Sequence, residues 1–171
     1  PLSAAIVVLF VLCVQLVVRR HRQSVQLRRN EREFRAQAQV LEMLTTGHSL
    51  RDVLAAIARA IEDLASASHV VIRLVEQNGG SLQLRLAAAP TMPPGLGDCA
   101  DVIPIGPSGT SCGVAAESGR TVIDVDTLEC AHWAGARDVI ERSGIRSCWS
   151  FPIRGAAGEV LAAVGERPTR A

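Results

Sequence analysis

Cysteines are the residues of this chain most able to do chemistry. There are five of them, at Cys13, Cys99, Cys112, Cys130 and Cys148. Their number is odd and no two form a Cys-x-x-Cys pair, so we expect reduced thiols and no disulfide framework. Cys112 follows Ser111 at the expected start of a short helix, where the helix dipole favours a thiolate. It is the candidate for a reactive thiol, and a small buried side chain is the alternative.

Among the cysteines and histidines, only Cys130 and His132 stand close together in the sequence. A structural metal site takes about four such ligands, usually from two spaced pairs. No second pair stands near this one in the sequence. We therefore expect no metal site, and the residues identify no cofactor.

Three glycines, Gly106, Gly109 and Gly113, precede and enter the same short helix. Backbone N–H groups at such a position can bind an anion. A nucleotide phosphate loop also needs a Gly-Lys-Ser/Thr element, and the chain contains no lysine. These glycines are expected to form a tight turn.

Polar and aromatic residues near the later strands are further candidates. Asp124 lies near the end of an expected strand over 121–125, and Asp126 is expected to cap the loop that follows. Trp133 begins an expected helix, and Trp149 lies in an expected strand over 147–153. An indole N–H can bond a ligand, and a place in the core is the alternative for both tryptophans.

The first 18 residues are almost wholly apolar, with Ser3 and Gln15 as the polar exceptions in 2–18. As a helix, this run would measure ~26 Å, near the ~30 Å of a bilayer's hydrocarbon core. Seven arginines follow within 19–35, and such clusters mark the cytoplasmic side of a span. We expect residues 1–18 to form a single transmembrane helix in the inner membrane, with the rest of the chain in the cytoplasm. A buried core helix is the alternative.

Residues 19–46 are expected to form a cytoplasmic connecting helix. Leu27, Phe34 and Leu41 repeat at intervals of seven, which is typical of a coiled coil and favours a homodimer. The second position of each heptad seam is more polar, with Asn30, Gln37 and Leu44. A lone amphipathic helix resting on anionic lipid headgroups therefore remains the alternative.

Residues 47–165 read as one domain, followed by a tail over 166–171. Ser49 is a good N-cap for an amphipathic helix over 50–64. The segments 69–76 and 82–86 have the alternation of a β-hairpin, and several short strands and helices follow. This order lacks a regular βαβ alternation, so we expect the α+β class with a central antiparallel sheet. Only 3% of residues are aromatic, which argues against a base-stacking nucleic-acid binder.

Several stretches around Trp133 resemble GAF domains of bacterial signalling proteins. They are Ile105-Gly-Pro-Ser-Gly-Thr-Ser-Cys-Gly-Val-Ala-Ala-Glu-Ser-Gly-Arg120, Val122-Ile-Asp-Val-Asp126 and Gly144-Ile-Arg-Ser-Cys-Trp-Ser-Phe-Pro-Ile153. The resemblance covers roughly residues 41–164. It implies a sheet with helices on one face and a small-molecule pocket on the other. The expected ligand-binding residues are Ser111, Cys112, Asp124, Trp133, Cys148 and Trp149.

The resemblance implies a non-catalytic sensor that relays ligand binding to a linked effector absent from this chain. The effector would be a diguanylate cyclase, a phosphodiesterase or a histidine kinase. One alternative is a thiol enzyme of the free methionine sulfoxide reductase type, although its Ile-Ala-Cys-Asp element is missing. Another is a ligand-free dimerisation module. The last strand is expected to end near Gly165, which would leave the domain incomplete.

Overall fold

The computed structural model describes residues 2–65, 68–92 and 101–168, and their side chains from residue 19 onward. Helices and strands alternate irregularly along the chain. The elements are α1 (Leu2–Thr45), α2 (Leu50–Ala65), β1 (Ser68–Asn78), β2 (Ser81–Ala88), β3 (Val102–Pro104), α3 (Thr110–Ser118), β4 (Val122–Asp124), the 3-10 helix η1 (Ala131–Ala136), α4 (Arg137–Ser143), β5 (Cys148–Arg154) and β6 (Val160–Pro168).

The six strands form one antiparallel sheet in the order β3-β2-β1-β6-β5-β4. The chain therefore places its last long strand, β6, beside its first, β1. The β1–β2 hairpin turns at Gly79 and Gly80, both with positive φ, as a two-residue hairpin loop requires. This confirms the α+β fold with a central antiparallel sheet.

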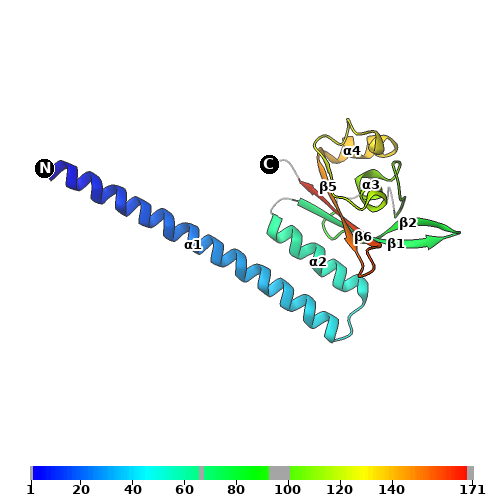
Figure 1. The fold of residues 1–171 in the computed structure, drawn as a ribbon, viewed down its shortest axis with the longest axis horizontal. Helices are drawn as coiled ribbons and strands as arrows, with labels where there is room; N and C mark the ends of the chain where they lie inside the picture. The colour runs from blue at the N-terminus through cyan, green and yellow to red at the C-terminus, as the bar shows by residue number, and fades with distance from the viewer. Residues whose placement is uncertain (1, 66–67, 93–100, 169–171) are drawn as a thin grey trace.

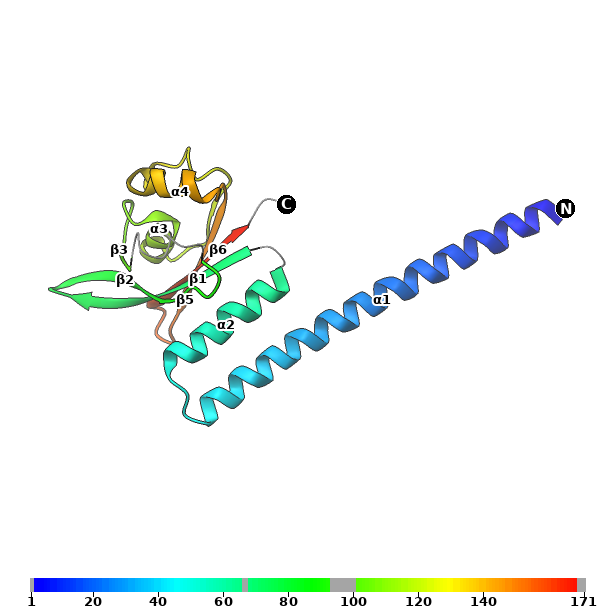
Figure 2. The same cartoon turned by 180° about the vertical axis from the view of Figure 1, so that it is seen from behind.

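Helices cover both faces of the sheet (Figures 1 and 2). One face carries α2, whose Ala58 packs with Val70 and Ile72 of β1. The other face carries α3, η1 and α4, which enclose the buried side chains of β5 and β6. The candidate site lies on this second face.

The predicted N-terminal cap of α2 is confirmed. The backbone N–H of Asp52 donates to Ser49 Oγ over 3.2 Å, and the Ser49 hydroxyl donates to Asp52 Oδ2 over 2.7 Å. The cap satisfies one of the backbone donors that every helix start leaves unpaired. It fixes the point where the chain reverses from α1 into α2.

The long helix α1 packs against α2 along its C-terminal part and projects far beyond the domain (Figure 2). Ala36, Val40 and Met43 are partly buried, at the three-to-four-residue spacing of one helix face. The heptad residues are mostly exposed, although Leu41 borders a groove between α1 and α2. Leu27, Phe34 and Leu41 have exposed fractions of 68%, 73% and 63%.

No helix in the part of the chain that the structure describes is both long and apolar enough to cross a membrane. The predicted transmembrane segment, residues 1–18, lies outside the described side chains. Its backbone from Leu2 onward continues into the connecting helix without a break.

The last strand runs further than its sequence predicts. Gly165, Glu166 and Pro168 suggest a strand end followed by a tail, but β6 continues to Pro168. Each residue from Ala162 to Pro168 has a partner in β1, ending with Pro168 opposite Ser68. The strand end expected near Gly165 is therefore too early, because pairing along a neighbouring strand outweighs weak local strand propensity.

The glycine-rich turn before α3 is a close approach of two backbone segments. A Cβ at Gly109 would lie 1.8 Å from the Pro104 carbonyl oxygen, and one at Gly113 would lie 2.5 Å from it. Both positions therefore exclude any side chain. This arrangement accounts for the glycines through packing, as expected for a tight turn.

Candidate functional site

A row of polar and sulfur-bearing side chains crosses the sheet beneath α3 and η1. Asp124 of β4 pairs with Cys148 of β5, and the β5–β6 register places Cys148 next to Arg167. Side chains on neighbouring strands at the same level share one face of the sheet. Asp124, Cys148 and Arg167 are all buried.

Asp124 is the acceptor for two ring N–H groups from η1. Trp133 Nε1 donates to its Oδ2 over 2.7 Å, and His132 Nε2 lies 2.8 Å from the same oxygen. The carboxylate is only 4% exposed, and Trp133 is 3% exposed. These bonds fix η1 over the end of β4, and they join two of the predicted site residues.

Cys130 lies beside this group. Its thiol donates to the Asp126 carbonyl over 3.2 Å, and burial followed by the charge of Asp124 raises its pKa. The donor atoms of Asp124, Cys130 and His132 lie within 4.8 Å of one another. The sequence suggested only Cys130 and His132 as neighbouring metal-ligand types, and the tertiary structure brings Asp124 to the same group. Protein hydrogen bonds already hold all three side chains.

Two buried thiols and two hydroxyls meet between α3 and β5. Cys112 Sγ lies 3.4 Å from Ser150 Oγ, which lies 3.8 Å from Cys148 Sγ. Burial raises the pKa of the Cys148 thiol, and Cys112 adds to that effect, while Arg167, Ser111 and Ser150 oppose it. The Cys148 thiol is therefore expected to be protonated at neutral pH.

Ser111 is fully buried at the start of α3, and no hydrogen-bond partner for its Oγ is found among the described residues. Most buried hydroxyls have a partner, because an unpaired one costs about 1–3 kcal/mol. The Ser111 hydroxyl acts on the Cys148 thiol and lowers the pKa of that thiol. A thiol is a weak hydrogen-bond partner, so a stronger acceptor or donor from a ligand would suit Ser111 better.

Two buried arginines complete the cluster, and neither is among the site residues predicted from the sequence. Arg73 lies in β1 and Arg167 in β6, and each is 4% exposed. Burial lowers the pKa of Arg73, and the nearby charge of Arg167 lowers it further. Arg73 interrupts the apolar run Val70-Val-Ile72, and this break in an otherwise buried strand was the available signal.

The structure brings together five of the six predicted site residues. Ser111, Cys112, Asp124, Trp133 and Cys148 lie on the α3 side of the sheet. Trp149 does not join them, because successive residues of a strand point to opposite faces. Its side chain is 41% exposed on the other face, together with Phe151 and Ile153 of β5.

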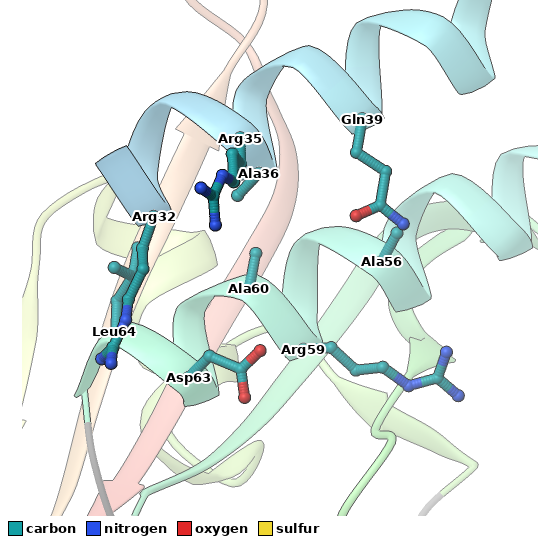
Figure 3. Close-up of a pocket in the computed structure, with 9 residues that line it drawn as sticks. All are labelled: Arg32, Arg35, Ala36, Gln39, Ala56, Arg59, Ala60, Asp63 and Leu64. Carbon is teal, nitrogen blue, oxygen red and sulfur yellow. The ribbon is translucent and has the colours of Figure 1, made fainter. Parts of the chain in front are cut away.

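Open grooves lie elsewhere, between α1 and α2, and two of the larger ones are formed by described residues. One has a volume of about 530 Å³, and Figure 3 shows Arg35 of α1 and Asp63 of α2 directed into it. The other, of about 610 Å³, has an apolar lining that includes Val40, Leu41 and Ile61. Both grooves are separate from the buried cluster.

Comparisons with known proteins agree with this fold. The family model described as a GAF domain matches residues 47–170. A stretch of 126 residues is 25% identical to the methyl sulfide methyltransferase-associated sensor of Methanosarcina acetivorans, covering 74% of this chain and 12% of that protein.

Solved structures show the same architecture. The GAF domain of A. aeolicus NLH2, in an inactive state, superposes with a TM-score of 0.61 at 16% identity, covering 84% of this chain and 83% of that one. The substrate complex of fRMsr from Staphylococcus aureus gives 0.55 at 20% identity, with coverages of 78% and 76%. At these identities the likeness concerns the fold alone. Since the family model spans most of the chain, this protein belongs to the GAF domain family.

Proposed function

We propose that this chain is the sensory part of a signalling protein and that its GAF domain binds a small molecule without chemically changing it. One observation carries the proposal: the buried face under α3 and η1 holds polar groups with unused hydrogen-bonding capacity. Ser111 Oγ and Arg167 Nε have no hydrogen-bond partner among the described residues. The description of the Methanosarcina relative as a sensor supports the same function.

The two tryptophans provide a matched test. In a Trp149→Phe variant, Trp133 alone reports on the buried cluster, and in Trp133→Phe, Trp149 alone reports on the far face. We expect a metabolite panel to contain compounds that change the emission of the first variant and leave the second unchanged. If no compound alters Trp133 emission or the melting temperature, the ligand-free dimerisation module is favoured.

Catalysis by Cys112 is the second candidate function, because fRMsr shares the fold. A nucleophilic cysteine needs an accessible thiol with thiolate character. Cys112 is 1% exposed and contacts Ser150, and burial raises the pKa of the neighbouring Cys148. We therefore expect no reduction of free methionine sulfoxide with dithiothreitol as donor. Turnover that disappears in Cys112→Ser would establish the enzyme instead.

We also propose that α1 tethers and pairs the sensor. The apolar run over residues 2–18 and the arginines after it support a membrane anchor, and the exposed Leu27, Phe34 and Leu41 support a second copy as partner. A conformational change in the domain would then reach a linked effector through α2 and α1.

The anchor and the dimer have separate tests. The full chain should stay with membranes in high salt, and a version beginning at Ala36 should not; release of the full chain by salt would leave only surface attachment. In detergent, light scattering should give a dimer mass that Phe34→Glu with Leu41→Glu reduces to a monomer. An unchanged mass would remove this stripe as the interface.

A further inference from the structure

Arg167 is a buried cation whose contacts with Met92 and Trp133 are uncharged. Its Nη1 donates to Met92 Sδ over 3.4 Å, and its guanidinium carbon lies 5.6 Å from the centre of the Trp133 ring. Its Nε donates no hydrogen bond, and none of the ion pairs among the described residues includes it. A buried charge is ordinarily paired, because removing it from water is strongly unfavourable.

The neighbouring groups do not neutralise this charge. The nearest carboxylate in the row, Asp124, accepts hydrogen bonds from Trp133 and His132 and makes no ion pair with Arg167. The Cys148 thiol stays protonated, because burial raises its pKa. Among the ion pairs of the described residues, none therefore matches the positive charge of Arg167.

We propose that the ligand sensed by this cluster carries an oxyanion group, a carboxylate or a phosphate, which Arg167 binds with the Ser111 hydroxyl as a second donor. The inference rests on the proposed sensory function of the same cluster. A guanidinium matches the two oxygens of such a group with two parallel N–H donors. The β5–β6 register places Arg167 beside Cys148, and the Ser111 hydroxyl acts on the same Cys148 thiol. Binding would give hydrogen-bond partners to Ser111 Oγ and Arg167 Nε, which have none among the described residues.

A first test needs no ligand. Arg167→Met keeps much of the side-chain volume and removes the charge. In chloride buffer free of carboxylate and phosphate, we expect its melting temperature to equal or exceed that of the wild-type protein. The matched control is Arg142→Gln, an exposed arginine in the last turn of α4. A loss of stability for Arg167→Met well beyond that of the control would show that the chain already neutralises Arg167, and would overturn the proposal.

A second test identifies the source of the oxyanion. The full chain is melted with succinate or inorganic phosphate at constant ionic strength, against sodium chloride. We expect at least one probe to raise the melting temperature by a few degrees in a saturable manner. The shift should persist in Arg142→Gln, shrink in Arg167→Lys and Ser111→Ala, and vanish in Arg167→Met. A shift retained in Arg167→Met, or no shift with either probe, contradicts the anionic class.

The experiments distinguish a wrong ligand class from a domain that binds no ligand at all. If uncharged metabolites change Trp133 emission while both anions are inert, the domain is a sensor and its ligand is neutral. If neither charged nor uncharged compounds act on Trp133, both proposals fall together.

Discussion

The indole Nε1 of Trp133 donates a 2.7 Å hydrogen bond to Oδ2 of Asp124, and both side chains are buried. This bond joins η1 to the end of β4 at the edge of the sheet. An unpaired buried donor costs about 1–3 kcal/mol, more than an ordinary hydrogen bond contributes.

We expect Asp124→Ala to lower the free energy of unfolding by about 1–3 kcal/mol, because it leaves the Trp133 and His132 donors without an acceptor. Urea melts followed by tryptophan emission measure the loss. In a Trp133→Phe background, Asp124→Ala should lower the free energy of unfolding by less, because the indole N–H donor is already absent. Additive effects of the two substitutions would mean that the bond is not an energetic link.

Stability should fall at alkaline pH because of Cys148, whose thiol has a pKa raised by burial. In the unfolded chain a cysteine ionises near pH ~8.5, while the folded thiol stays protonated. The protonated thiol of Cys148 therefore makes its full contribution to the free energy of unfolding below that pH. Above it, this contribution declines by up to about 1.4 kcal/mol per pH unit. Melting temperatures between pH 7 and 10 should drop less steeply in Cys148→Ser than in the wild-type chain. Parallel curves would rule out this linkage.

Gly109 should tolerate no side chain. Because a Cβ there would lie 1.8 Å from a backbone oxygen, Gly109→Ala has to displace the turn, and we expect a cost of about 3 kcal/mol, the upper end for overpacking. Gly135→Ala is the matched control, since nothing lies within 4 Å of its added Cβ and its φ is not positive. The control should stay within about 0.5 kcal/mol of the wild type. Equal denaturation midpoints for the two variants would contradict the close approach.

Glu62 of α2 accepts a hydrogen bond from the β1 backbone at Val70, which lies beyond the last residue of β1 that pairs with β2. Its Oε1 accepts from the Val70 N–H over 2.9 Å and from the Thr91 hydroxyl over 2.6 Å. We expect Glu62→Ala to cost about 1–3 kcal/mol, because the buried Val70 N–H then has no acceptor. Glu62→Gln keeps a carbonyl oxygen for both donors and should cost less. Denaturant midpoints compare the two, and similar losses would point to the charge of Glu62 as its main contribution.

Local sequence signals predicted most of the elements, because their causes are local. Ser49 begins a helix by capping it, Gly79 and Gly80 turn a hairpin, and Gly119 ends α3 with the positive φ that an ordinary residue disfavours. Asp126 caps its loop by accepting from the Leu128 N–H, as the sequence suggested. Such features need only a few neighbouring residues, so the chain itself specifies them.

The tertiary structure alone decided the extent of β6 and the composition of the candidate site. Local residues suggest a strand end at Gly165, yet pairing with β1 carries the strand on to Pro168 and buries Arg167. Trp149 follows Cys148 in the sequence, but successive residues of a strand point to opposite faces of the sheet, so Trp149 lies outside the site. Asp124, Cys148 and Arg167 are far apart in sequence and adjacent only because β4, β5 and β6 align in one register. Register is a long-range property of strand pairing, and no local pattern encodes it.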